Sequence, residues 1–406
     1  MNHLEYLFGL EQFGIKFGLD NIRAILARLD HPERAYPAVH IAGTNGKGSV
    51  TAMVETGLRA AGYRTGRYTS PHLIELRERF AVCGIPVAQD AMIDAIGDVR
   101  AAVEALQRDG SLDVHPTFFE VTTAVAFELF RRAHIEIAVV EVGLGGRLDA
   151  TNVLTPVVTA ITSIAFDHQL YLGMTLSDIA REKAGIIKPG VPVILGDMDP
   201  SARAAIEEVA GAQRAPVVHA EVAGINVQTL ALRGRHQRVN AAIAVGVLDA
   251  LNARGISVLP PAVDAALTKT QWSGRIDRRS VSAGRELLMD AAHNPAGAQA
   301  LASFLQDERM RPPLVFAAMR DKDVDGMFRA LLPTVHSVTF TRATNPRSAD
   351  PAGLAAAARA VAPSLPVAIE PVPADALARA WKDAPLILVA GSVFLLGDVM
   401  QHLGLH

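Results

Sequence analysis

A glycine-rich segment constrains the fold of this chain more than any other feature. It reads AGTNGKGS at residues 42–49, between an apolar run at 38–41 typical of a short buried strand and residues 50–61, where apolar and small residues fall at helical spacing. Strand, glycine-rich turn and helix form the context that a phosphate-binding loop requires. The glycines let backbone N–H groups point at an anion, while the helix start and Lys47 add positive charge. The sequence therefore predicts a site for a nucleoside triphosphate.

The spacing of this segment differs from the general pattern GxxxxGK[ST]. Ser49 stands two places after Lys47, and Ile41 occupies the position of the first glycine. The alternative interpretation is a glycine-rich turn with an incidental lysine. The agreement of strand, glycines, lysine, hydroxyl and helix argues against that alternative.

Composition narrows the class of protein. The chain has 406 residues, half of them hydrophobic, which is enough for two or three domains with sizeable cores. The formal net charge is −3 and there is no dense basic run, so we expect no nucleic-acid partner. One cysteine, Cys83, excludes an internal disulfide. Residues 1–18 do not read as a secretory signal and no apolar run reaches membrane-spanning length, so we expect a cytoplasmic protein without membrane contact.

Polar residues follow several predicted strands in the first two thirds of the chain. Strands are expected at 63–69, 79–83, 135–142, 156–161 and 191–195. The strands at 63–69, 135–142 and 156–161 lead to polar segments at 70–73, 143–152 and 167–169. Ligands of an open parallel sheet bind at the edge where the carboxyl ends of its strands meet. These polar segments are therefore expected to lie together, near the phosphate-binding loop.

The pattern divides the chain into two α/β parts. Helices of the first part are expected at 88–108, 117–132, 177–187 and 239–253, while residues 196–235 show no clear order. A break at 270–275 predicts a boundary, with one domain at 1–275 and a second at 280–406. The second part alternates strands, expected at 286–290, 314–318, 335–340, 366–370 and 386–390, with helices, expected at 296–306, 324–332, 351–361, 374–382 and 393–402. Such alternation is typical of a doubly wound sheet.

A triphosphate site calls for a divalent ion to screen the phosphates. The candidate oxygen ligands are Ser70, Glu120 and Asp149, and His168 is a candidate for a second ion. Taken singly, each of these residues is better explained by a structural role, such as a Ser-Pro turn or a helix N-terminal charge. From the residues alone, the chain is predicted to be an ATP-using enzyme with a cleft between two α/β domains.

Eleven short motifs, in order, resemble folylpolyglutamate synthase and the bifunctional dihydrofolate synthase/folylpolyglutamate synthase, relatives of the Mur ligases. They are AGTNGKGS at 42–49, TSPHL at 69–73, FFEVTTA at 118–124, EVGLGGRLDATN at 141–152, FDHQLYLG at 166–173, EKAGIIKPG at 182–190, GRHQRVNAA at 234–242, WSGR at 272–275, DAAHNP at 290–295, RDKD at 320–323 and AGSVFLLG at 390–397. The resemblance implies a large N-terminal P-loop ATPase domain of Mur-ligase type with a mostly parallel sheet, and a smaller C-terminal Rossmann-like α/β domain.

The resemblance also implies a reaction. ATP phosphorylates a carboxylate of an acceptor to give an acyl phosphate and ADP, and the amino group of L-glutamate then displaces phosphate. The implied cofactors are ATP, two Mg²⁺ ions and a carbamylated lysine at Lys183. The stretch at Ile15–Leu19 resembles the neighbourhood of the pterin site in bifunctional bacterial members. That similarity favours 7,8-dihydropteroate and reduced folates as acceptors, and by analogy we expect a monomer.

Individual roles follow from the resemblance position by position. Residues implied to hold the nucleotide are Asn45, Gly46, Lys47, Gly48, Ser49, Asn240, Arg275 and Asp290. Residues implied to hold metal are Ser70 and Glu120 for one ion, and His168, Glu120 and carbamylated Lys183 for the other. Residues implied to act in catalysis are Lys47, Lys183 and His293, and Ser392 is implied near the glutamate site.

Two alternatives stay open within this chemistry. The enzyme either acts on both acceptors or only extends folates, and a Mur-type amino-acid ligase would share the two ATP-handling domains. Mur-type ligases carry a nucleotide-sugar domain before the loop, and the roughly forty residues before Gly43 are too few for one. A small-molecule kinase would not need a second domain carrying DAAHNP. A binding protein without catalysis would not need the full set of reactive residues.

Overall fold

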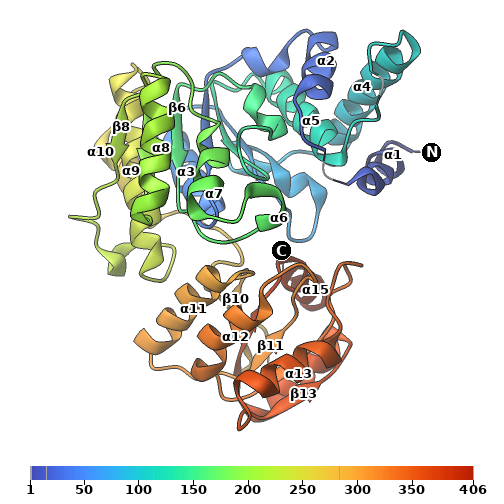
Figure 1. Cartoon of the computed structure of the whole chain (residues 1–406), viewed down its shortest axis with the longest axis vertical. Coiled ribbons are helices and arrows are strands. Elements are labelled where there is room, and N and C mark those ends of the chain that lie inside the picture. Colours follow the sequence, from blue (N-terminus) through green and yellow to red (C-terminus); the bar gives the residue numbers. More distant parts are fainter. Residues whose placement is uncertain (1, 15, 113, 283, 406) are drawn as a thin grey trace.

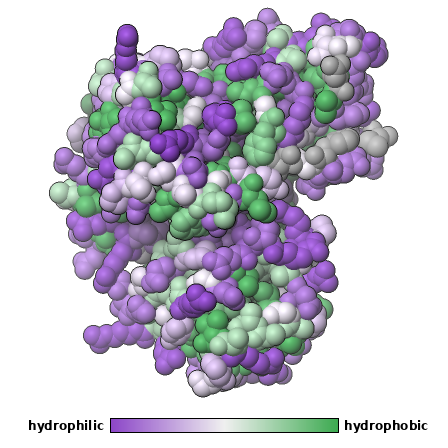
Figure 2. All heavy atoms as spheres, in the orientation of Figure 1, coloured by the Kyte–Doolittle hydropathy of each residue, from purple (hydrophilic) through white to green (hydrophobic). Residues whose placement is uncertain are grey.

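Two mostly parallel sheets organise the molecule. The computed structural model describes residues 2–14, 16–112, 114–282 and 284–405. Figure 1 shows a larger body, coloured blue to yellow, above a smaller orange and red one. On the face in Figure 2, hydrophilic side chains gather where the two bodies meet. The α/β fold class predicted from the sequence is confirmed.

The larger body is built on a sheet with strand order β4-β3-β2-β5-β1-β6-β7-β8. Its strands are β1 (Ala38–Ala42), β2 (Thr65–Tyr68), β3 (Phe80–Val82), β4 (Ile85–Pro86), β5 (Ile137–Glu141), β6 (Val158–Ile161), β7 (Val193–Leu195) and β8 (Val217–His219). Within this order, β2-β5-β1-β6-β7-β8 pair in parallel, while β3 and β4 form an antiparallel edge beside β2. Every residue of the central β1 is buried, which explains its unbroken apolar run.

Helices cover both faces of this sheet. They are α1 (His3–Gly9), α2 (Asp20–Arg28), α3 (Lys47–Ala60), α4 (Gln89–Arg108), α5 (Phe118–Arg132), α6 (Gln169–Leu172), α7 (Leu176–Ala184), α8 (Pro200–Ala212), α9 (His236–Ala253) and α10 (Pro260–Thr268). Helices α3, α9 and α10 pack on one face around Met53, Leu58 and Leu248. Helices α4 and α5 pack on the other face around Phe127 and Phe130, with α1 and α2 beside them.

The smaller body repeats the same principle. Its strand order is β13-β12-β11-β14-β10-β9, and only β9 runs antiparallel. The elements are β9 (Asp277–Ser280), β10 (Glu286–Asp290), α11 (Pro295–Asp307), β11 (Leu314–Phe316), α12 (Val324–Leu331), β12 (Val338–Phe340), α13 (Pro351–Val361), β13 (Val367–Ile369), α14 (Pro373–Asp383), β14 (Leu386–Ala390) and α15 (Val393–Leu403). Three buried rings, Phe316, Phe328 and Phe340, contact one another with centroids 5.3–6.0 Å apart and fill its core.

The elements that the sequence did not predict show little contrast between buried apolar and exposed polar positions. The stretch at 196–235 contains α8 and β8, and α10 follows α9. The core-facing side of α8 consists mostly of alanine (Ala202, Ala205 and Ala210), which gives little contrast with its exposed side. The edge strands β8 and β9 are short and partly exposed. The second sheet begins with β9, inside the interval left between the two predicted domains.

One loop of the larger body is anchored in the smaller one. Leu73 and Ile74, which follow β2, pack against the buried cluster around Leu396 and Met400. The Glu78 carboxylate accepts three backbone N–H bonds, from Leu73 and Ile74 at 2.8 Å and from Glu75 at 2.6 Å. This carboxylate therefore fixes the loop in the shape that docks on α15.

No helix within the described part of the chain combines the length and apolar character that a bilayer crossing requires.

A matched pair of glycine substitutions tests this docking. A Cβ at Gly397 of α15 would fall well inside contact distance of the Leu73 carbonyl oxygen, whereas a Cβ at Gly211 of α8 would meet open space. Both glycines are helical, so alanine alone favours folding by about 1 kcal/mol. We expect Gly211→Ala to raise the thermal unfolding midpoint and Gly397→Ala to lower it, because overpacking costs about 1–3 kcal/mol. An equal rise in both variants contradicts the docking.

Candidate active site

The phosphate-binding loop connects β1 to α3, at the carboxyl edge of the first sheet. Gly43 and Gly46 have φ of 148° and 86°, values that residues with a Cβ rarely adopt. A Cβ at Gly43 would collide with the Thr162 hydroxyl, and one at Gly46 with the side-chain oxygen of Asn240. The Thr162 hydroxyl also donates a 2.6 Å hydrogen bond to the carbonyl of Asn45. The glycines are therefore required both by the turn and by what packs against it.

Two lysines converge on one carbonyl oxygen of this loop. Lys47 Nζ lies 3.1 Å and Lys183 Nζ 2.9 Å from the Gly43 oxygen. Lys183, near the end of α7, is 4% exposed. Burial, assisted by the neighbouring charge of Lys47, lowers the pKa of Lys183 to about 7. Two amines gathered at a glycine-rich helix start make a strong anion site.

Ser70, Glu141 and His168 approach the loop from neighbouring strand ends. Glu141 is the last residue of β5, and its Oε2 accepts a 3.4 Å hydrogen bond from the Ser70 backbone N–H. Burial raises the pKa of Glu141, and the charges of Lys47 and Arg275 partly offset that rise. Burial, together with the charge of Lys322, lowers the pKa of His168 to about 4. Its imidazole is therefore neutral near pH 7, the form that binds metal.

Glu120, predicted as a ligand of both metal ions, lies elsewhere. Its Oε2 accepts hydrogen bonds from the Thr117 backbone N–H at 2.7 Å and the Thr117 hydroxyl at 2.9 Å. The Glu120 N–H donates back to that hydroxyl at 3.1 Å, which completes a capping box at the start of α5. The structure thus corrects the placement of Glu120, and Glu141 occupies the position beside Ser70. The sequence does contain a signal for Glu141. It is a carboxylate at the end of an otherwise apolar strand, and that strand pairs with β1, which leads into the phosphate-binding loop.

Asp149 does not face the site either. Its oxygens accept hydrogen bonds from the N–H groups of Leu144 and Thr151 and from the Thr151 hydroxyl. These bonds shape the turn after β5. Ser392 caps the start of α15 by accepting the Phe394 N–H at 3.2 Å.

The remaining predicted residues share one cavity of about 410 Å³ between the two bodies. Those that line it are Asn45, Gly46, Lys47, Gly48, Ser49, Ser70, His168, Lys183, Asn240, Arg275, Asp290 and His293. Asn240 comes from α9, while Asp290 ends β10 and accepts hydrogen bonds from the N–H groups of Ile276 and Ala292 at 2.9 Å. The roles assigned to these residues stay predictions, but the fold brings them together.

Asp167 joins the two bodies across this cavity. Its carboxylate accepts from Lys322 Nζ at 2.7 Å and from Asn294 Nδ2 at 3.0 Å, and lies 3.5 Å from His293 Nε2. Burial alone would raise the pKa of Asp167, but the hydrogen bond from His293 and the charge of Lys322 outweigh it and hold that pKa well below its usual range. The paired amides of Asn45 and Asn294 add two bonds, at 2.9 and 3.1 Å. The sequence analysis assigned no role to Asp167, Asn294 or Lys322.

The side chains present fit a divalent ion only in company with phosphate. No three His, Cys, Asp or Glu residues in the described ranges stand close enough to hold a metal by themselves. Mg²⁺ is commonly held by one or two protein ligands together with substrate phosphates and water. Ser70 and Glu141 beside the loop match that pattern, and they supply the oxygen donors that Mg²⁺ prefers.

Two Mur ligase families match the chain. Residues 41–218 match the Mur ligase middle domain, and residues 274–393 match the Mur ligase, glutamate ligase domain. The dihydrofolate synthase/folylpolyglutamate synthase of Bacillus subtilis (strain 168) is 36% identical over 369 residues, which cover 84% of this chain and 85% of that protein.

Solved structures agree with these matches over the whole fold. Mycobacterium tuberculosis folylpolyglutamate synthase, complexed with ADP and AMPPCP, superposes with a TM-score of 0.89 at 33% identity and covers 99% of each chain. A bifunctional folylpolyglutamate synthase/dihydrofolate synthase with Mn, AMPPNP and L-glutamate bound gives a TM-score of 0.85 at 28% identity, over 100% of this chain and 98% of that one. The chain therefore belongs to the folylpolyglutamate synthase/dihydrofolate synthase family of Mur ligases, which are ATP-dependent, ADP-forming amide ligases.

Proposed function

We propose that this enzyme adds L-glutamate both to 7,8-dihydropteroate and to the γ-carboxylate of reduced folates. The observation that carries the proposal is the convergence of Lys47 and Lys183 on the phosphate-binding loop, in a cavity that both bodies line. The names of its relatives support the two acceptors. The alternative is an enzyme that only extends folates.

The proposed reaction has two steps, because a carboxylate must be activated before an amine can attack it. A carboxylate is a poor electrophile, so its oxygen first attacks the γ-phosphorus of ATP, which forms an acyl phosphate and releases ADP. The glutamate amine then attacks the acyl carbon, an amide forms, and phosphate departs with the former carboxylate oxygen. The loop N–H groups and Lys47 hold the triphosphate and stabilise charge during the transfer. Asn240, Arg275 and Asp290 bind the rest of the nucleotide.

Ser70 and Glu141 would hold one Mg²⁺ beside the phosphates, and His168, with Glu141 and a modified Lys183, would hold a second. When bound, such ions screen phosphate charge and polarise the transferred group. The side chains of Ser70, Glu141, His168 and Lys183 all line the cavity that contains the loop. Glu141 thereby takes the part first assigned to Glu120.

Lys183 is suited to carbamylation. An amine attacks CO₂ only in its neutral form, and a pKa of about 7 leaves much of Lys183 neutral at physiological pH. The C–N bond forms as the amine loses a proton, and the product carries a carboxylate-like group. The carbamate would also relieve the repulsion between Lys183 and Lys47.

His293 is proposed to steady the reacting phosphate. Its Nδ1 lies 2.8 Å from the Ala291 carbonyl oxygen, a contact that requires a proton on Nδ1. Its Nε2 faces Asp167 and the same cavity as the loop. Asp167 and the Ala291 carbonyl together fix the ring orientation.

The acceptor ring is proposed to enter beside the segment before α2. Ile15 of the predicted stretch lies outside the described residues, but Phe17 is half exposed and its ring lies 5.9 Å from that of Tyr171. Tyr171 comes three residues after the proposed metal ligand His168, which supports this proposal. One chain supplies every residue named, so we propose that the enzyme acts as a monomer.

ADP release with each acceptor tests the function. The purified protein receives ATP, Mg²⁺ and L-glutamate with either 7,8-dihydropteroate or a tetrahydrofolate. We expect glutamate-dependent ADP release with both. Turnover with tetrahydrofolate alone leaves the folate-extending alternative, and turnover with neither acceptor contradicts the proposed function.

Two matched amide substitutions separate Glu141 from Glu120. Glu141→Gln removes the proposed metal-binding charge, so we expect kcat/KM to fall on the order of a hundredfold and the Mg²⁺ requirement to rise. Glu120→Gln keeps a residue that completes a capping box, so its activity should stay within about twofold. Steady-state rates over a Mg²⁺ titration measure both variants. The reverse ranking would return the metal site to Glu120.

The carbamylation of Lys183 predicts a dependence on CO₂. After removal of CO₂, activity should recover faster at pH 8 than at pH 6 when dissolved CO₂ is equal, since the neutral amine predominates above the pKa of about 7. Lys183→Ala should fold normally, lose activity on the order of a hundredfold and show no response to CO₂. Rates that ignore CO₂, or near-normal turnover by Lys183→Ala, remove the lysine from the metal site.

A further inference from the structure

Two segments of the larger body interlock beside the phosphate-binding loop. One is the segment at 143–152 after β5, and the other is the end of α7, which carries Lys183. A Cβ at Gly146 would lie 2.6 Å from the Lys183 carbonyl oxygen, and a Cβ at Gly185 would collide with Arg147. Only glycine permits so close an approach at these two positions. The two backbones therefore touch directly beside Lys183.

Hydrogen bonds reinforce this contact. The Arg147 N–H donates to the Glu182 carbonyl at 2.8 Å, and the Arg147 guanidinium pairs with the Glu182 carboxylate at 2.7 Å. Asn152 joins the two segments a second time. Its Nδ2 donates to the Arg147 carbonyl at 2.9 Å and to the Gly185 carbonyl at 3.0 Å. A single amide, 5% exposed, thus bridges the segment after β5 and the end of α7.

Lys188 fixes the orientation of the Asn152 amide. Lys188 Nζ donates to Asn152 Oδ1 at 2.8 Å and to the Asn152 backbone carbonyl at 3.1 Å. An ammonium offers donors and no acceptor, so the atom that it meets is the amide oxygen. The amide nitrogen therefore faces the two carbonyls that it bridges.

The end of α7, held in this way, directs Lys183 toward the phosphate-binding loop. Lys183 Nζ donates to the Gly43 carbonyl at 2.9 Å and lines the cavity of about 410 Å³. A shift of the α7 backbone would move this amine with it. Displacement of a reacting group by about 1 Å can cost on the order of a hundredfold in rate. The interlock is therefore placed to influence the reaction without touching a substrate.

We infer that Asn152 is a positioning residue for Lys183. Its amide locks the end of α7 to the segment after β5 and so holds the Lys183 amine at the Gly43 carbonyl. The inference rests on the proposed function, which gives Lys183 its task. It also assigns a joint role to the motifs EVGLGGRLDATN and EKAGIIKPG, which supply the two sides of the interlock.

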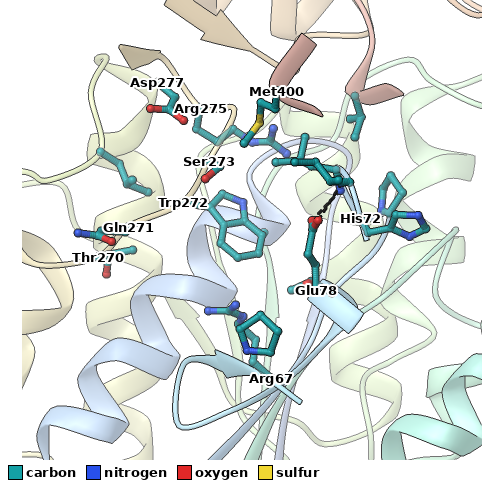
Figure 3. Close-up of a pocket in the computed structure, with 18 of the residues that line it drawn as sticks. Arg67, His72, Glu78, Thr270, Gln271, Trp272, Ser273, Arg275, Asp277 and Met400 are labelled. Atoms are coloured by element: carbon teal, nitrogen blue, oxygen red, sulfur yellow. Dashed lines mark hydrogen bonds between the residues drawn. The ribbon is translucent and has the colours of Figure 1, made fainter. Parts of the chain in front are cut away.

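The larger cavity that adjoins the first lies outside this interlock. Its volume is about 890 Å³, and Figure 3 shows Trp272 among the residues that line it. Glu141 lines both cavities, whereas neither Asn152 nor Lys183 is among the described residues that line the larger one. A substitution of Asn152 should therefore act on the Lys183 side of the smaller cavity.

A purely structural role for Asn152 is the competing explanation, and Asn252 provides the matched control. Asn252 Nδ2 donates to the Val258 carbonyl at 2.9 Å, and its Oδ1 accepts the Val258 N–H at 2.6 Å. This amide fastens the loop after α9 and is absent from the described lining of both cavities. Asn152→Asp and Asn252→Asp both replace a donating amide by a carboxylate of the same shape. Both should lose stability, but only the first should release Lys183.

Labelling of lysines with acetic anhydride, read by mass spectrometry, tests the inference without turnover. The full chain is kept in CO₂-free buffer, so that Lys183 is a free amine, and its labelling rate is divided by that of the exposed Lys382. We expect a low ratio in the unsubstituted protein, because Lys183 is 4% exposed. The ratio should rise about tenfold in Asn152→Asp, which loses both bridging hydrogen bonds, and stay unchanged in Asn252→Asp.

Steady-state rates give the second readout. Asn152→Asp should lower kcat about tenfold or more and leave KM for ATP within about twofold, since Lys47 and the loop still bind the nucleotide. Asn252→Asp should keep both values. If Asn152→Asp does not fold, Lys188→Met, which removes the donor that orients the amide, should still raise the labelling ratio about threefold.

Three results overturn the inference. They are an unchanged labelling ratio in Asn152→Asp or its substitute Lys188→Met, an equal rise in Asn152→Asp and Asn252→Asp, and a normal kcat in Asn152→Asp. Failure of ADP release by the unsubstituted protein with both acceptors overturns the proposed function instead. The labelling ratio then still decides whether Asn152 positions Lys183, because it does not depend on turnover.

Discussion

The amines of Lys47 and Lys183, which both donate to the carbonyl oxygen of Gly43, dominate the electrostatics of the site. The charge of Lys47 and burial together lower the pKa of Lys183 to about 7, and a bound anion, or a modification of the Lys183 amine, would offset the charge that the two amines carry when both are protonated. A Cβ at Gly43 would collide with the Thr162 hydroxyl, so the loop needs glycine at this position. Nucleotide binding and the proposed carbamylation both answer the same electrostatic demand.

Residues of the smaller body lie against the phosphate-binding side of the larger one. The Asp167 carboxylate of the larger body contacts Lys322, Asn294 and His293 of the smaller body. The loop after β2 also docks on α15 through Leu73. The docking of the two bodies thereby gathers the predicted nucleotide-binding residues of both around one cavity. Such positioning supplies much of the rate enhancement for a reaction whose chemical groups belong to the substrates.

Sequence patterns predicted the strand-loop-helix unit and the polar strand ends well, because both follow from local rules of backbone geometry and burial. They failed where local and tertiary roles look alike. Glu120 and Glu141 are both buried acids in apolar surroundings, and only the fold shows that Thr117 engages the first while the second faces Lys47. The role of Asp167 could not be predicted from the sequence either, because its partners Asn294 and Lys322 lie more than a hundred residues away along the chain. The alanine-rich α8 was missed because its apolar contrast is weak.

Activation of a carboxylate by phosphoryl transfer from ATP can be followed with an oxygen label. The acceptor carries ¹⁸O in its reacting carboxylate, and the products are collected during turnover with ATP and L-glutamate. We expect one labelled oxygen in the inorganic phosphate, because that oxygen bridges carbon and phosphorus in the acyl phosphate and leaves with phosphorus. Phosphate that is free of the label, or a label that appears in AMP, would rule out activation through an acyl phosphate.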